Sequence, residues 1–331
     1  GPVWIEVPLD VQGAQIDPKS LSAPCFSDTF APSPESAQIT RILDLLEQSN
    51  RPLILVGHGV RLASASSEFV KLVEKLKIPV VCTWNALDLL PHDHPLYVGS
   101  PGVVALRAPN FAIQNCDLLV SIGCRLDNVI TAYNPDKFAK NALKVVVDID
   151  INELNNHKLD ITEKIHANAS DFIRVLNSRV LNSYLDRTAW IEQCISWKNR
   201  YPVNDGNPFG EEGSISHYHF VDILSDVLPE NILISTGSSG LAIEAFYSAF
   251  RSKRNQRIYL TSGLGSMGYG LAASIGACLG NNSRPAVAIE SDGSLMLNLQ
   301  ELATLKALNL PLKVIIMDNK VKNLYPDLLD H

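Results

Sequence analysis

The stretch RPAVAIESDGSLMLNLQELATLKALNLPLKVIIMDNK, residues 284–320, decides the fold of this chain. Two short apolar runs, residues 284–290 and 311–317, have the length and the Val, Ala and Ile content of buried strands. Between them, four leucines recur at helical spacing: Leu295, Leu299, Leu302 and Leu305. A strand, a helix and a second strand make a βαβ unit, so the stretch predicts two parallel strands joined by a crossover helix.

Polar residues follow both predicted strands. Asp292 comes just after the first strand and Asn319 just after the second, at the strand ends where open α/β sheets bind ligands. One charged and one neutral oxygen ligand suit Mg²⁺, which takes its remaining ligands from water and phosphate. Gly293 and Ser294 open the helix, and the free N–H groups of a helix start can hold a phosphate. The stretch therefore predicts a Mg²⁺–diphosphate site.

The pattern resembles the signature of thiamine diphosphate enzymes, in which an Asp-Gly-Ser loop precedes an Asn by 27 residues (319 − 292 = 27). More specifically, it is similar to acetolactate synthase, also called the acetohydroxyacid synthase large subunit. GPVWIEVPLDVQ resembles the end of that family's pyrimidine-binding domain. RPLILVGHGV, DLLVSIGCRLDN and KVVVDIDINEL resemble its middle domain, and LTSGLGSMGYGLAASIGA resembles its diphosphate-binding domain.

The resemblance implies a positioning role for the glycine loop at residues 263–268. The carbonyl of Gly265 would accept a hydrogen bond from the cofactor's aminopyrimidine. Met267 would hold the cofactor in its bent form, with Ser266 as a neighbouring contact. In this interpretation Gly265 and Met267 are the catalytic positions present in the chain, because the family's activating Glu belongs to the pyrimidine-binding domain.

The resemblance also assigns the metal and phosphate contacts. Asp292 and Asn319 would bind Mg²⁺, with the backbone carbonyl near Val321 as a third protein ligand. Phosphate would contact Gly293 and Ser294, together with a second loop that lies between a predicted strand and a predicted helix: Gly237, Ser238 and Ser239. Acetolactate synthases usually carry Gln-His in this second loop, so the chain departs from the family there.

FAD is a further candidate cofactor, because acetolactate synthases bind it in the middle domain. The positions that match are Gly57, Gly59, Gly123 and Arg125. The alternative is that these glycines serve loop geometry and that Arg125 pairs with a carboxylate. A second family arginine is replaced here by Val129, so the sequence leaves FAD binding open.

The function implied is a 2-oxo acid decarboxylase and carboligase that depends on thiamine diphosphate and Mg²⁺. It would act on small 2-oxo acids as a homodimer or tetramer of the complete chain. Ser291 and Asp318 stand where the family usually has Gly and Asn. The chain also stops twelve residues after Asn319 (331 − 319 = 12). We therefore expect a fragment of such an enzyme that is inactive alone.

Two other classes of function compete with this interpretation. The segment from Gly263 to Gly268 matches G-x-G-x-x-G after a short strand, and Glu290 lies 22 residues beyond Gly268. That spacing suits the ribose-binding acid of an NAD-dependent oxidoreductase. The third class is a non-catalytic, degenerate paralogue that keeps the fold but performs no turnover.

The order of strands and helices predicts an α/β protein with two doubly wound parallel-sheet domains, a central Rossmann-like domain and a truncated diphosphate-binding domain. Strands are expected at residues 52–56, 79–83, 118–122, 144–148, 232–236 and 257–260. Proline-rich and glycine-rich segments mark linkers. The expected division is 1–12, end of the pyrimidine-binding domain; 13–37, linker; 38–197, middle domain; 198–214, linker; and 215–331, diphosphate-binding domain.

Composition excludes several classes of function. The 331 residues carry a net charge of −7 without a basic run, which argues against a nucleic-acid surface. No stretch approaches the ~18 apolar residues of a membrane span. Six scattered cysteines without CxxC spacing indicate reduced core residues and a cytoplasmic protein, with organellar targeting left open. His92 and His94 have metal-pair spacing, but loop histidines beside proline are more often solvated.

Overall fold

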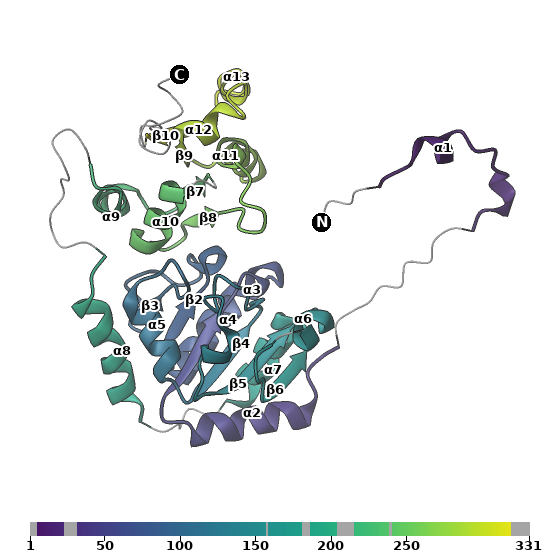
Figure 1. Ribbon diagram of the computed structural model, residues 1–331. Helices are drawn as coiled ribbons and strands as arrows, with labels where there is room; N and C mark the ends of the chain where they lie inside the picture. The colour runs from purple at the N-terminus through teal and green to yellow at the C-terminus, as the bar shows by residue number, and fades with distance from the viewer. Residues whose placement is uncertain are drawn as a thin grey trace. The chain divides into compact units, whose positions relative to one another are not determined.

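The computed structural model describes residues 5–22, 32–156, 158–180, 186–203, 215–237 and 240–318, without the side chains of residues 240–242. The chain divides into two compact units, Gly1–Phe30 and Ala31–His331. The first unit contains a short helix, α1 (Leu9–Gln12), and a 3₁₀ turn, η1 (Pro18–Ser20). The second unit contains two parallel sheets with helices on both faces (Figure 1).

The first sheet has six parallel strands in the order β3-β2-β1-β4-β5-β6. They are β1 (Pro52–Val56), β2 (Val80–Cys82), β3 (Tyr97–Gly99), β4 (Leu118–Ile122), β5 (Leu143–Asp148) and β6 (Glu163–His166). The chain builds outward from β1 to β3 and then returns to place β4 on the other side of β1. The carboxyl ends of β1 and β4 therefore form a topological switch point.

Helices cover both faces of this sheet because successive side chains of each strand point to opposite faces. Ile54 and Val56 share a core with α2 (Ser36–Gln48), α4 (Ser66–Leu76) and α7 (Ala169–Arg179). Leu53 and Leu55 share a second core with α5 (Arg107–Asn115), α6 (Ile151–Asn156) and α8 (Thr188–Arg200). The short helical segments are α3 (Gly59–Leu62), η2 (Trp84–Ala86) and η3 (Pro135–Lys137).

The second sheet has four parallel strands in the order β10-β9-β7-β8. They are β7 (Leu233–Thr236), β8 (Arg257–Tyr259), β9 (Ala286–Ser291) and β10 (Leu312–Met317). The helices are α9 (His217–Val227), α10 (Gly240–Ala249), α11 (Tyr269–Gly280), α12 (Asp292–Met296) and α13 (Glu301–Ala307). Because β8 and β9 lie on opposite sides of β7, the switch point of this sheet lies between the ends of β7 and β9.

Within the second unit, the first sheet and the second share buried contacts. One continuous apolar cluster includes Val56 of β1 and Phe246 of α10. Trp84 stacks on Tyr247 with ring centroids 5.4 Å apart. Asp88, whose side chain is 1% exposed, accepts a hydrogen bond from Arg257 at 3.0 Å. These contacts hold the amino edge of the second sheet against the loop that follows β2.

The structure confirms the parallel α/β class, and β1 and β4 coincide with the expected strands. The single crossover helix expected from the leucine spacing is wrong in one respect, because residues 297–300 separate α12 from α13. Within the described ranges, no helix is long and apolar enough to cross a membrane. Five cysteines of the described residues are buried and form no disulfide: Cys82, Cys116, Cys124, Cys194 and Cys278. Cys25 lies outside the described residues.

Candidate functional site

The glycine loop and the Asp-Gly-Ser turn meet at the carboxyl edge of the second sheet. Gly268 is the N-cap of α11 and has a φ of +82°, a conformation that favours glycine. Its N–H donates to Ser294 Oγ at 2.8 Å, and its carbonyl accepts from Asn298 Nδ2 at 2.8 Å. Ser294 of the acidic turn and Asn298, four residues later, therefore hold the end of the glycine loop through the N–H and the carbonyl of Gly268.

The acidic turn begins α12. Ser291 ends β9, and its hydroxyl accepts from the N–H of Ser294 at 3.4 Å, which caps the helix. Asp292 is partly exposed in the first turn, where the helix dipole favours a negative charge. The structure shows no hydrogen bond or ion pair of its carboxylate with another described residue. Asp292 is thus available to a cation.

Met267 and Gly265 border the same space. Met267 is 48% exposed, and its Cε lies 3.7 Å from the position that a Cβ at Gly293 would occupy. Gly265 has a φ of +63°, and no described atom lies within 4 Å of its own Cβ position. Ser266 is exposed between them. The loop therefore presents an open edge toward the acidic turn, as binding of a cofactor between them requires.

The strand register places two aspartates just after paired strand ends. Ser291 of β9 pairs with Met317 of β10, so Asp292 and Asp318 follow neighbouring strands that lie about 4.8 Å apart. Asn319 and Val321, the other expected metal ligands, lie outside the described residues, as do Ser238 and Ser239. Among the described residues, no group of three or more His, Cys, Asp or Glu could hold a metal. A Mg²⁺ ion here would need amide, backbone, water or phosphate oxygens besides Asp292.

Glu290 is buried at the switch point between β7 and β9. Its side chain is fully shielded from solvent, and Oε1 accepts from the N–H of Leu271 at 3.1 Å. A Cβ at Gly237 would collide with Oε2, and one at Gly270 would lie 2.5 Å from Oε1. Oε2 has no hydrogen-bond partner in the described part of the chain. Glu290 is thus a buried contact between β7 and α11, and it is not placed to bind an exposed ribose as an NAD site requires.

Comparison with known families agrees with this geometry. A family described as "Thiamine pyrophosphate enzyme, central domain" matches residues 39–176. A second, "Thiamine pyrophosphate enzyme, C-terminal TPP binding domain", matches residues 235–325, which include the glycine loop and the acidic turn. The chain belongs to the thiamine pyrophosphate enzymes.

Several relatives of this member of the thiamine pyrophosphate enzyme family are named as acetolactate synthases. "Probable acetolactate synthase large subunit" of Methanocaldococcus jannaschii is 32% identical over 97% of this chain and 55% of its own length. "Acetolactate synthase 2, chloroplastic" of Nicotiana tabacum is 32% identical over 97% of this chain and 48% of its own. "Acetolactate synthase isozyme 1 large subunit" of Escherichia coli is 32% identical over 98% of this chain and 56% of its own length. The chain spans about half the length of these relatives.

The four candidate FAD contacts, which belong to the first sheet's domain, all contact other residues of the chain. Gly57 and Gly59 pack directly on the backbone of Gly123, and Gly59 N–H donates to its carbonyl at 2.9 Å. Arg125 lies 3.3 Å from Glu153, with its side chain 70% exposed. Loop packing and an ordinary ion pair therefore explain all four residues, and their geometry adds no argument for FAD.

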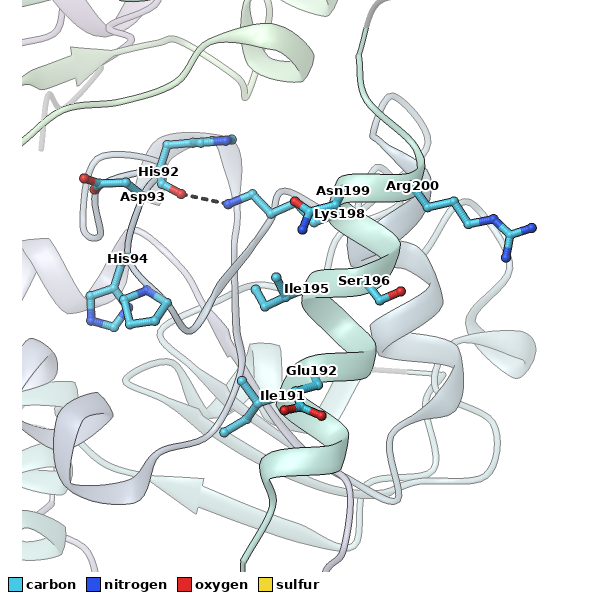
Figure 2. Close-up of a pocket in the computed structure, with 11 residues that line it drawn as sticks. His92, Asp93, His94, Ile191, Glu192, Ile195, Ser196, Lys198, Asn199 and Arg200 are labelled. Carbon is cyan, nitrogen blue, oxygen red and sulfur yellow. Dashed lines mark hydrogen bonds between the residues drawn. The ribbon is translucent and has the colours of Figure 1, made fainter.

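A surface pocket of about 860 Å³ lies between the loop carrying His92 and His94 and helix α8 (Figure 2). Lys198 of α8 donates to the carbonyls of His92 at 2.7 Å and Tyr97 at 3.1 Å. Burial lowers the pKa of His92 to about 3 and that of Lys198 to about 8. His92 is thus half-buried and packs edge-on against Tyr97, contrary to the expectation of a solvated loop histidine.

Two residues of the site, Asn298 and Glu290, were not singled out from the sequence as structural contacts. Asn298 interrupts the run of leucines at the point where α12 ends, and this polar residue is a weak signal for a helix break. Glu290 is a carboxylate at the end of the apolar strand AVAIE. A charge in a fully buried strand indicates a specific partner, and this signal was available in the sequence.

Proposed function

We propose that this protein is a 2-oxo acid decarboxylase and carboligase of the acetolactate synthase type that depends on thiamine diphosphate and Mg²⁺. The observation that carries the proposal is the junction of the glycine loop with the acidic turn through Gly268 and Ser294. This junction lies at the strand ends where parallel sheets bind ligands. The relatives named as acetolactate synthases support the choice of reaction.

The residues at the junction suit the cofactor's two charged parts. Asp292 would hold Mg²⁺ together with Asn319 and the carbonyl near Val321, because Mg²⁺ prefers hard oxygen ligands. The diphosphate would contact N–H groups and hydroxyls at the starts of two helices: Gly237, Ser238, Ser239, Gly293 and Ser294. Asp318 adds a second negative charge beside Asp292, which strengthens the attraction for a divalent cation.

The glycine loop would orient the rest of the cofactor. The open space beside Gly265 leaves its carbonyl accessible, with Ser266 exposed next to it, and Met267 stands over Gly293. When bound, thiamine diphosphate supplies the electron sink for decarboxylation of a 2-oxo acid and for addition to a second carbonyl. The chain's residues would hold the cofactor in one orientation, which is a proximity effect.

The proposal extends to partners and location. We expect small 2-oxo acids as substrates and a second copy of the complete chain as partner, in a homodimer or tetramer. We expect the cytoplasm or an organelle as the compartment, because one of the relatives is named chloroplastic. FAD stays an optional cofactor of the proposal, supported only by the resemblance to acetolactate synthases.

Cofactor binding tests the proposal directly. Isothermal titration of thiamine diphosphate in Mg²⁺ buffer would be compared between the wild type and Asp292→Ala, with Glu230→Ala as a control. Glu230 is exposed and lies beyond the opposite, amino edge of the same sheet. We expect saturable, Mg²⁺-dependent binding that weakens by about tenfold or more in Asp292→Ala, since a charged metal ligand is lost.

Binding that is unchanged in Asp292→Ala would contradict the metal assignment. Saturable binding of NADH that is abolished in Gly265→Val would instead support the oxidoreductase. Cofactor binding is the readout because the resemblance assigns the family's activating Glu to the pyrimidine-binding domain, of which these 331 residues resemble only the end. A complete protein that binds the cofactor but never decarboxylates a 2-oxo acid would identify the degenerate paralogue.

A further inference from the structure

A second cleft lies at the amino edge of the second sheet, away from the cofactor junction. It has a volume of about 840 Å³, within the size range of small-molecule sites. One wall comes from α3, α4 and the loop after β2 in the first sheet. The other wall comes from the residues that precede β7, β8 and β9, including Asn231 and Arg284. The cofactor junction lies at the carboxyl ends of the same strands, so the two sites are separate.

The lining of this cleft is positively charged. Five cations line it: Arg61, Lys253, Arg254, Arg257 and Arg284. The carboxylates in the lining are Glu74 and Asp88, so the cleft carries a formal charge of +3 (5 − 2 = 3). The whole chain has a net charge of −7. The local excess of positive charge is therefore a property of this cleft and does not follow from the composition.

The buried carboxylate of the cleft is already shared by two arginines. Asp88 Oδ1 accepts from Arg61 at 2.6 Å, and Oδ2 accepts from Arg257 at 3.0 Å and from the N–H of Ile258 at 2.9 Å. One negative charge thus faces two guanidinium groups. In addition, Arg61 Nε is buried and has no hydrogen-bond partner in the described residues. Both observations leave donor capacity and positive charge on the cleft wall.

The other three cations have no carboxylate partner in the part of the chain that the structure describes. Lys253 donates to the backbone carbonyls of Asp226 and Leu228, and Arg284 donates to those of Asn231 and Asn255. Arg254 is exposed and forms no ion pair there. Neutral carbonyls hold Lys253 and Arg284 in place without neutralising them, so all three cations leave positive charge on the lining of the cleft.

We propose that this cleft binds a small phosphate-bearing polyanion. Guanidinium groups match phosphate oxygens in geometry and charge, and arginines from both walls border one space. Ser66 and Ser67 add the start of α4, which has no side-chain cap, and the N–H groups of such a helix start favour an anion. A ligand here would bridge the two walls and increase the stability of their contact.

Inorganic tripolyphosphate is the first probe, and ATP is the second. Isothermal titration of the 331-residue chain at low ionic strength, without Mg²⁺, is expected to show saturable binding of tripolyphosphate. Equal affinity for ATP would identify the phosphate groups alone as the ligand, whereas tighter ATP binding would identify a nucleotide. Either result supports a polyanion site, since the phosphates are common to both probes.

Charge reversal locates the site. Arg254→Glu is expected to weaken binding by about tenfold or more, because a charge-assisted contact is replaced by repulsion. Lys140→Glu makes the same charge change at an exposed position outside the cleft and should leave the affinity within about twofold. Asp292→Ala, at the cofactor junction, should also retain binding.

Three results would overturn the inference. The first is the absence of saturable binding. The second is equal weakening in Arg254→Glu and Lys140→Glu, which would indicate only a general charge effect. The third is loss of binding in Asp292→Ala alone, which would place the anion at the cofactor junction. Because the structure shows no hydrogen bond or ion pair of Arg254 with a described residue, its replacement tests the ligand without removing a fold contact.

Discussion

Glu290 and Gly237 occupy one contact at the switch point of the second sheet. The carboxylate of Glu290 fills the space that a side chain at position 237 would need, and Gly237 N–H donates to the carbonyl of the preceding residue, Ile289, at 2.6 Å. The other carboxylate oxygen accepts from Leu271 in the first turn of α11. A single buried side chain therefore links the end of β7 to the start of the helix that carries the glycine loop.

The first prediction concerns this contact. Gly237→Ala should destabilise the protein by about 1–3 kcal/mol, because the added methyl group collides with a buried carboxylate. Urea unfolding followed by circular dichroism would measure the change. Gly276→Ala is the matched control, since among the described residues no atom outside the helix's own nearby backbone lies within 4 Å of a Cβ at that position in α11. A methyl group in an open helix position should be neutral or slightly stabilising.

The partner variant makes the test specific. If the collision with Glu290 causes the loss, Glu290→Ala should make the second change, Gly237→Ala, much less costly in a double-mutant cycle. Equal cost of Gly237→Ala in both backgrounds would show that the collision is not the cause. A neutral result for Gly237→Ala in the wild type would contradict the packing itself.

The second prediction concerns Asn298, which donates to the carbonyl of Gly268. Asn298→Asp keeps the shape but removes the donor, so a carboxylate oxygen would face a carbonyl oxygen. The glycine loop should lose the hydrogen bond from Asn298 to Gly268, and the affinity for thiamine diphosphate should fall by about tenfold. Titration calorimetry in Mg²⁺ buffer measures this. Asn141→Asp makes the same change at an exposed position just before β5 of the first sheet and should bind like the wild type. Equal affinity of all three proteins would show that Asn298 does not contribute to cofactor binding.

Much of the fold follows from local patterns that the sequence displays. The central strands β1 and β4 are fully buried runs of apolar residues, and their bounds agree with the expectation. β3 and β6 were not predicted, because each has only three or four residues and β6 is polar on one face. Edge strands of this kind are defined by pairing with a neighbour, and pairing is not visible in a local window.

The site was only partly predictable for a similar reason. Asp292, Gly265 and Met267 lie in short motifs, so their neighbourhood could be expected from the sequence. The hydrogen bond from Asn298 that holds the loop at Gly268 could not be expected from the sequence. Asn298 can make it only because α12 ends before residue 298, whereas the leucine spacing predicted a continuous helix through that point. The cleft cations come from segments far apart in the chain, and only the packing of the two sheets brings them together.

The third prediction concerns Asp88, which binds Arg61 and Arg257 across the contact between the two sheets. Asp88→Asn should destabilise the protein by about 3 kcal/mol, because two half-buried guanidinium groups would lose their shared carboxylate. Urea unfolding measures the change. Asp136→Asn, an exposed change of the same kind in η3, should lie within about 0.5 kcal/mol of the wild type.

Removing one of the two arginines separates charge from packing. In the double variant Asp88→Asn with Arg257→Gln, part of the lost stability should return, since fewer positive charges face each other. A double variant that loses the sum of both single changes would show that the three side chains act independently, contrary to the shared carboxylate in the structure.

The fourth prediction concerns pH. Burial lowers the pKa of His92 to about 3 from an ordinary value of 6.5, with Lys198 and Arg251 adding to the decrease and Asp222 opposing it. Between about pH 3 and pH 6.5, His92 is protonated in the unfolded chain but neutral in the folded chain. The free energy of unfolding therefore rises with pH in this window. The contribution of His92 to stability is lost as pH falls from 6.5 toward 3.

Replacing His92 should remove its share of that loss. The difference in unfolding free energy between about pH 7 and about pH 4.5 should be smaller in His92→Asn than in the wild type, since asparagine does not titrate. Asn199→Ala changes the same surface pocket without removing a titrating group, so it should keep the wild-type difference. His58 and His94, whose pKa values burial also lowers, contribute equally in all three proteins. An unchanged difference in His92→Asn would mean that this side chain takes up its proton without unfolding the loop around it, and that the contact with Tyr97 does not depend on a neutral ring.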